Sequence, residues 1–189
     1  MTDLLSSQEF LDLFRSFQHT AIRLETRDRY VVEAEQAALA RFLAGQKIDP
    51  VYEHERAFWD QELVAQSVAA GKRFERVRVV PEPLTAYLRF SLRGAGYLTR
   101  AGENINYLGR AQANALDLPA HDFWLLDAER LVLLYFTADD RLLGSQTITE
   151  PAAVRQHARW FELAREHATP YRLYLAEDPT RDDPPTGGA

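Results

Sequence analysis

Hydrophobic and polar positions alternate along this chain with two different periods. Residues 131–136 form an almost unbroken apolar run, which is typical of a strand covered on both faces and predicts a place in the middle of a sheet. Residues 122–127 hold four apolar residues between two acids. Because only a short turn separates the two stretches, they predict a β-hairpin at the centre of the fold.

Five stretches have the spacing of amphipathic helices. Ser6 and Glu9 form the pattern of a capping box at the start of the first of them, and the second ends at Gly45. Pro83 and Pro151 are expected in the first turns of the fourth and fifth helices. The predicted helices cover about 7–17, 32–45, 51–70, 83–100 and 151–169.

Strand-like stretches lie between these helices. They cover 20–27, 74–80, 104–108 and 142–149, and 171–175 is expected to add a final strand or strap. Interleaved helices and strands predict an α/β (α+β) fold with a mixed β-sheet flanked by helices. We expect a single domain over residues 1–176 and a disordered tail over 177–189, which is rich in Asp, Pro, Thr and Gly.

Charged residues share one face of two predicted strands. Arg23, Glu25 and Arg27 fall on one side of the first strand, and Arg76 and Arg78 fall on one side of the second. If these strands are neighbours, an acid lies among several guanidinium groups. The functional interpretation is a surface that recognises an anion. The alternative is a structural network of ion pairs on a solvated strand face.

Two further groups of residues suggest chemistry. Tyr87 and Arg89 fit a platform for a flat ligand, or a core with arginine stems along it. Asp122, Trp124 and Asp127 lie in the first arm of the hairpin. An odd separation puts the two acids on opposite faces, so they are expected to be turn or cap residues rather than a catalytic pair.

Composition narrows the class of protein. A net charge of -6 argues against non-specific nucleic-acid binding, and the absence of cysteine excludes disulfides and thiolate chemistry. The five histidines lack metal-ligand spacing, and the nine glycines form no phosphate-binding loop. We therefore expect no metal and no cofactor. With no signal peptide and no apolar stretch long enough for a membrane span, the predicted location is the cytoplasm.

Three segments, 17–30, 76–90 and 118–127, together resemble an actinobacterial family of unknown function. The similarity extends over residues 9–176, and it implies a gene neighbourhood with helix-turn-helix regulators of the XRE type. Residues 122–175 are also similar to the second half of phospholipase-D-like sensor domains, which implies a phospholipase-D-like topology. Catalytic members of that superfamily need His-x-Lys, whereas Arg56 and Arg159 follow His54 and His157 here, so their phosphodiesterase chemistry is not expected.

From these observations we expect a non-enzymatic cytoplasmic regulatory or accessory protein that binds an anionic small ligand or a helix-turn-helix regulator. The alternative is an enzyme of specialised metabolism that uses Glu25 or Asp122 as a base and arginines to hold an anionic substrate. A third reading is a structural module or homodimer. The candidate binding residues are Arg23, Glu25, Arg27, Arg78, Tyr87, Arg89, Asp122 and Trp124.

Overall fold

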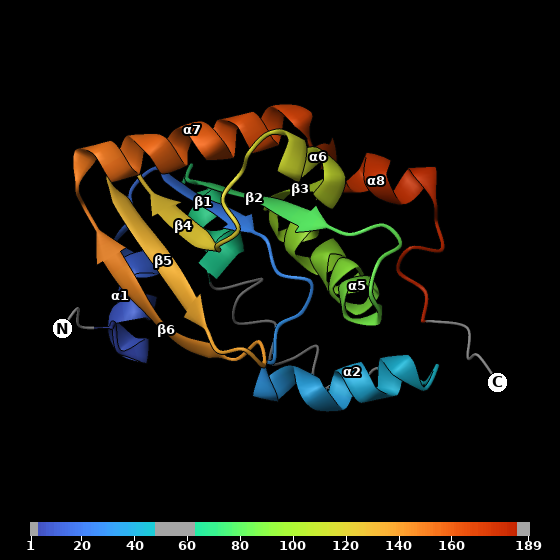
Figure 1. Ribbon diagram of the computed structural model, residues 1–189. Helices are drawn as coiled ribbons and strands as arrows, with labels where there is room; N and C mark the ends of the chain where they lie inside the picture. The colour runs from blue at the N-terminus through green and yellow to red at the C-terminus, as the bar shows by residue number, and fades with distance from the viewer. Residues whose placement is uncertain (1–3, 48–62, 185–189) are drawn as a thin grey trace.

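The computed structural model describes residues 4–47 and 63–184, and in this part of the chain a seven-stranded mixed sheet runs through the molecule (Figure 1). The strand order is β6-β5-β4-β1-β2-β3-β7. Strands β1, β2 and β3 are parallel neighbours, and the other neighbouring pairs are antiparallel. The strands are β1 (Thr20–Glu25), β2 (Arg73–Val80), β3 (Asn104–Gly109), β4 (Phe123–Leu126), β5 (Arg130–Phe136), β6 (Leu142–Ile148) and β7 (Thr169–Pro170).

Helices cover both faces of this sheet, which confirms the predicted α/β class. α7 lies along one face, and α1 and α5 lie on the other (Figure 1). The helical segments in the described residues are α1 (Ser7–Ser16), the 3-10 turn η1 (Glu33–Glu35), α2 (Gln36–Leu43), α4 (Gln66–Ala69), α5 (Ala86–Ala101), α6 (Arg110–Ala115), α7 (Pro151–His167) and α8 (Tyr171–Glu177).

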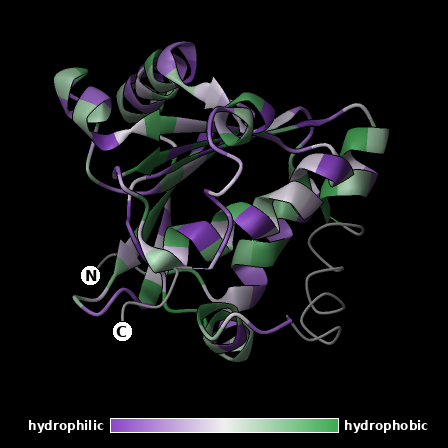
Figure 2. Ribbon diagram, turned by 90° about the vertical axis from the view of Figure 1, so that its right-hand side faces the viewer, coloured by the Kyte–Doolittle hydropathy of each residue, from purple (hydrophilic) through white to green (hydrophobic). Residues whose placement is uncertain are grey.

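Two hydrophobic cores follow from the alternation of side chains along the strands. On the α7 face, Leu24 and Leu125 pack with Phe161 of α7. On the opposite face, Phe74 and Trp124 pack against residues of α1 and α5. Figure 2 shows hydrophobic and hydrophilic residues, green and purple, on the same helices, as expected for helices with one face toward the sheet. Each face of the central strands is therefore inside the protein.

The predicted helix starts are confirmed at two sites. Ser6 and Glu9 form a complete capping box at α1, with each side chain bonded to the backbone of the other. Pro151 lies in the first turn of α7, and the Glu150 carboxylate accepts hydrogen bonds from the two backbone N–H groups that follow it. At α5 the prediction was wrong, because the helix begins after the N-cap Thr85 and Pro83 lies outside it.

The hairpin lies elsewhere in the sheet than predicted. β5 is the second strand of the sheet, next to the edge strand β6. The central strand is β1, because β2, β3 and β7 follow it on one side and β4, β5 and β6 on the other. The outer end of β5 is correspondingly less covered, with Tyr135 38% exposed. The apolar run therefore reflects burial of the first half of β5. The sequence pattern alone does not distinguish a strand buried in its first half from one buried along its whole length.

The segment 171–175, predicted to be a final strand or strap, lies in a helix, α8, which is preceded by the two-residue strand β7. Tyr171, Tyr174 and Leu175 share one side at helical spacing and pack against the core. A stretch of five residues is too short to distinguish the period of a helix from that of a strand. The first strand ends at Glu25 rather than 27, and the part of the predicted 51–70 helix before residue 63 lies outside the described residues.

Candidate functional site

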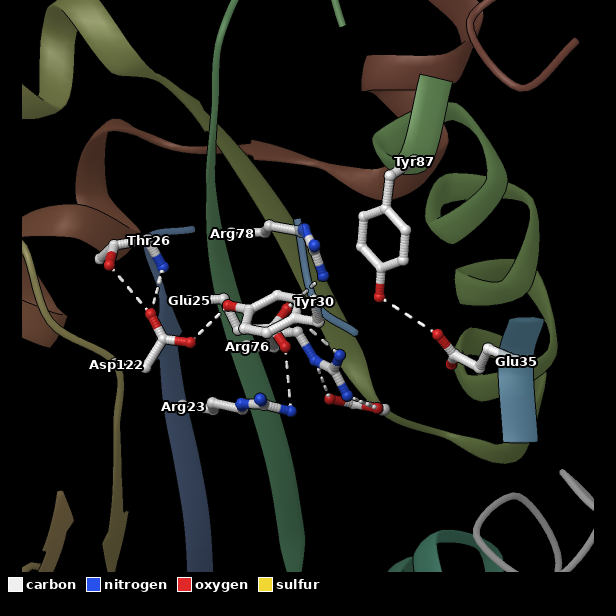
Figure 3. Close-up of polar contacts among 10 residues, drawn as sticks. Arg23, Glu25, Thr26, Tyr30, Glu35, Arg76, Arg78, Tyr87 and Asp122 are labelled. Carbon is white, nitrogen blue, oxygen red and sulfur yellow. Dashed lines mark hydrogen bonds and ion pairs between the residues drawn. The ribbon is translucent and has the colours of Figure 1, made fainter. Parts of the chain in front are cut away.

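A cavity of about 470 Å³ lies on the sheet face that α1 and α5 cover. Strands β1 and β2 line it with charged side chains, and α5 contributes Tyr87, Ser91 and Ala95. The segment after β1 supplies Tyr30 and Glu35 (Figure 3). Charged groups from the sheet therefore meet aromatic groups from the surrounding segments in one place.

Glu25 is the centre of the charged group. Its carboxylate contacts Arg23 Nη1 at 2.9 Å, Arg76 Nη1 at 3.3 Å and Arg78 Nη1 at 2.8 Å (Figure 3). The parallel register of β1 and β2 causes this arrangement, because it puts Glu25 beside Arg78 and Arg23 beside Arg76. The two strands are neighbours, so the prediction of an acid among several guanidinium groups is confirmed.

Burial and charge act in opposite directions on these groups. Burial alone raises the pKa of Glu25, but the positive charges of Arg23, Arg76 and Arg78 outweigh it and hold that pKa well below its ordinary value. Burial lowers the pKa of Arg78, and the Glu25 charge reverses the effect and raises it. Both groups are therefore ionised at neutral pH, although both are almost fully buried.

Arg76 and Arg78 differ in how their donors are used. Arg76 donates from Nε to Glu103 Oε1 at 2.7 Å and from Nη2 to Glu103 Oε2 at 3.0 Å, a bidentate pair. On Arg78 the same two atoms, Nε and Nη2, have no hydrogen-bond partner among the described residues. Arg78 is only 3% exposed, so these donors lie inside the protein and not at its surface.

Aromatic rings surround the two guanidinium groups nearest the cavity. The Arg78 Cζ atom lies 5.1 Å from the ring centre of Tyr30 and 5.9 Å from that of Tyr87. Arg23 Cζ lies 5.0 Å from the Trp124 ring. Tyr87 also donates its hydroxyl hydrogen to Glu35 at 3.2 Å. These contacts stabilise the cations while leaving the edges of the guanidinium groups available as donors.

Asp122 holds the Tyr30 side chain in place through a hydrogen bond. It is 1% exposed and accepts hydrogen bonds from the backbone N–H of Thr26 at 2.8 Å, from the Thr26 hydroxyl at 2.9 Å and from the Tyr30 hydroxyl. Burial, followed by the nearby negative charges of Glu25 and Asp122, raises the pKa of Tyr30, so the phenol stays protonated and donates. Asp122 thus fixes a ring that lines the cavity.

The second acid of the hairpin has a separate role, as the odd spacing predicted. Asp127 accepts the backbone N–H groups of Gln18, His19 and Thr20 at 2.8, 2.7 and 2.9 Å. It has a positive φ of 55° in the turn between β4 and β5. Asp122 and Asp127 therefore do not form a catalytic pair, and Asp127 connects the hairpin to the start of β1.

The structure brings five of the eight predicted site residues to the cavity wall: Arg23, Glu25, Arg78, Tyr87 and Trp124. Asp122 acts on the site through Tyr30. Arg27 pairs with Asp140, which itself lines the cavity. Arg89 lies elsewhere and donates to the backbone oxygen of Thr180 at 3.0 Å.

Several lining residues were missing from the predicted set. Tyr30 lies in a loop, and Glu103 follows Gly102, the C-cap of α5, so neither belongs to a periodic pattern. Arg76 shares the strand face of Arg78, and that alternation was the signal that could have added it to the set. Tyr107 lines the cavity from the next parallel strand, β3, where it pairs in register with Arg78.

Outside the cavity, the Nε2 atoms of His121 and His157 lie 3.0 Å apart. No three histidine or acidic side chains in the described ranges are arranged to hold a metal ion. Of the helices in residues 4–47 and 63–184, none combines the length and apolar character needed to cross a bilayer.

The fold and the charged cavity define a single-domain α/β protein with a polar site on one sheet face. Residues 8–176 match the family model described as a domain of unknown function, DUF6879. The chain belongs to this family. No curated protein matches the chain.

Proposed function

We propose that this protein binds a small organic anion in the cavity between β1, β2 and α5. The observation that carries the proposal is the unpartnered Nε and Nη2 pair of Arg78. These two N–H groups of an arginine point in parallel and match the two oxygens of a carboxylate or phosphate. The neighbouring Arg76 shows that geometry within this protein, because its own Nε and Nη2 hold Glu103.

The energetics favour a bound acceptor at this position. A buried donor without a partner costs about 1–3 kcal/mol, and more when the donor is charged. Arg78 carries two such donors, and Arg23 Nε is a third. A ligand oxygen pair at Arg78 would recover this cost on binding. The cavity volume of about 470 Å³ is within the range of small-molecule sites.

The two acids considered as catalytic bases are poorly suited to that role. The lowered pKa of Glu25 makes it a weak base, since three guanidinium groups stabilise its charged form. Asp122 is engaged by three donors from Thr26 and Tyr30. These contacts support a binding function over an enzyme that uses either residue for proton abstraction.

The biological role that we propose is a cytoplasmic regulatory or accessory one, in which the ligand changes association with a helix-turn-helix regulator. Its support is the family resemblance of the sequence rather than any surface of the structure. The phospholipase-D-like topology of the C-terminal half stays a prediction on the same basis. Co-purification of a tagged chain with a co-encoded regulator, with and without ligand, tests the partner.

The binding proposal is tested with a panel of carboxylates, phosphates and sulfonates, measured by thermal shift and then by calorimetry. At least one anion should raise the melting temperature of the wild type. Arg78→Lys keeps the charge but loses the parallel donor pair, so we expect affinity to fall by about tenfold or more. Arg89→Lys is the matched control, because Arg89 lies outside the cavity and should leave affinity unchanged.

The absence of binding by every anion in the panel would overturn the proposal. Equal affinity of wild type and Arg78→Lys would also contradict it, since the donor pair would then have no part in recognition. Circular dichroism of both variants separates lost binding from lost folding.

A further inference from the structure

We infer that the ligand is a monocarboxylate with a flat apolar body, and that Arg78 holds its carboxylate. This inference rests on the proposed function and narrows the chemistry of the same site. Its observations are the charge balance around Arg78, the apolar walls of the cavity and the rings beside the guanidinium group.

The charge balance limits the ligand to one negative charge. Three guanidinium groups, from Arg23, Arg76 and Arg78, lie at the floor of the cavity. Two carboxylates, Glu25 and Glu103, pair directly with them. The cavity wall also carries the carboxylates of Glu35 and Asp140, and Arg27 pairs with Asp140. The lining as a whole therefore has no surplus of positive charge, and only the local charge of Arg78 favours an anion, which fits a ligand with a single carboxylate.

A dianion is less suited to the same position. Glu25 Oε2 lies 2.8 Å from Arg78 Nη1, on the guanidinium group that would hold the ligand. The charge of Asp122 also acts on Tyr30, whose ring contacts Arg78. A second negative charge would be repelled by both acids in a buried site, where charges are weakly screened. This favours a carboxylate over a phosphate monoester.

Much of the remaining cavity wall is apolar. Leu98 and Ala95 of α5, Ile105 of β3, Leu134 of β5 and Phe74 of β2 contribute side chains without charge. These residues favour a hydrocarbon body, because its transfer from water releases about 25 cal/mol for each square ångström buried. A ligand with only an acidic group, such as acetate, would leave this surface unused.

The rings around the guanidinium group favour a flat body. Tyr30 and Tyr87 both lie within 6 Å of Arg78 Cζ. The Arg78 donors are buried, so a carboxylate that reaches them brings the body of its ligand close to these rings. A planar aromatic ligand can pack its ring against them, which a flexible aliphatic chain does less well.

The test compares three ligands that share one body and differ in head group: 2-naphthoate, 2-naphthyl phosphate and 2-naphthamide. Calorimetry with the wild-type chain should give the tightest binding for 2-naphthoate, with the other two about tenfold weaker or worse. Decanoate, a flexible monocarboxylate, should also bind more weakly than 2-naphthoate.

Two substitutions locate the site. Ser91→Leu adds volume at the cavity wall without changing charge, and it should weaken 2-naphthoate binding by about tenfold or more. Arg93→Leu introduces a leucine at an exposed position of the same helix, α5, and serves as the matched control. Arg78→Lys should weaken 2-naphthoate and leave the already weak 2-naphthamide unchanged.

The outcomes distinguish this inference from the broader proposal. Tighter binding of 2-naphthyl phosphate or of decanoate would overturn the flat monocarboxylate while anion binding stands. Equal binding of 2-naphthamide would overturn the requirement for charge. If none of the three binds but another anion of the panel does, only the ligand class is wrong; if no anion binds at all, both proposals fail.

Discussion

Arg76 and Arg78 lie two positions apart on the same face of β2, yet only Arg76 has its side-on donor pair occupied, by Glu103. Both share Glu25 through their Nη1 atoms. One sheet face therefore holds a completed guanidinium–carboxylate pair beside an incomplete one. This difference is the basis of the proposed binding site, and the following predictions test the arrangement around it.

Glu25→Gln should destabilise the protein strongly. The substitution leaves the buried guanidinium group of Arg78 and the partly exposed ones of Arg23 and Arg76 around a neutral amide, and removing one partner of a buried ion pair costs about 3–5 kcal/mol. Urea unfolding measures the change. Asp12→Asn breaks the exposed ion pair of Asp12 with Arg15 and should change stability very little. Similar small effects of the two substitutions would show that Glu25 does not organise the cluster.

Asp127→Ala should cost about 1–3 kcal/mol, because the carboxylate accepts three backbone N–H groups at the start of β1. Asp127→Asn tolerates the positive φ and retains one acceptor, so its cost should be smaller. Burial raises the pKa of Asp127, but the backbone hydrogen bonds outweigh it and lower that pKa.

The lowered pKa gives the Asp127 contribution a definite pH dependence. The stabilisation is present above about pH 3.9, the ordinary aspartate pKa, and is lost as the pH falls through the lowered value in the folded state. Unfolding of wild type and Asp127→Asn between about pH 5 and 2 should therefore converge toward acid pH. A constant difference across this range would contradict the assigned role.

Gly102→Ala should destabilise the protein more than Gly71→Ala. Both glycines have positive φ, +108° and +81°, so an alanine is strained at either position, by about 1–2 kcal/mol. At Gly102 the added Cβ would also lie 2.9 Å from Val68 Cγ1, whereas at Gly71 nothing lies within 4 Å. Urea unfolding of both variants separates backbone strain from the steric contact, and equal costs would show that Val68 adjusts freely.

The His121–His157 pair should make stability fall as the pH is lowered. Burial lowers the pKa of both imidazoles; the neighbouring His157 lowers that of His121 further, and Asp122 partly opposes this. The unfolded chain then binds more protons below about pH 6.5, so the free energy of unfolding decreases through that value and levels off below the folded-state pKa.

Unfolding at pH values from about 8 to 5 measures this dependence. The His157→Asn variant should have a flatter profile, because it removes the buried imidazole of the pair. His167→Asn, at an exposed position near the end of α7, is the control. An unchanged profile in His157→Asn would show that the pair does not couple proton binding to folding.

Local patterns predicted most of the elements because they depend on neighbouring residues alone. The capping box at Ser6 and the proline at 151 specify helix starts through contacts within four residues. The alternation of Arg76 and Arg78 with valines specified which residues share a strand face. The same patterns did not place β5 in the sheet or identify α8, since both depend on which distant segments cover them.

The amino-acid sequence by itself determined that arginines and an acid lie on one face of two strands, because side chains alternate along any strand. Only the tertiary structure decided that these strands are parallel neighbours in a register that puts Glu25 beside Arg78. It also brought Glu103 to Arg76 and the Tyr30 ring to Arg78. Those contacts join segments more than 20 residues apart, and they depend on sheet pairing and loop paths that no local period encodes.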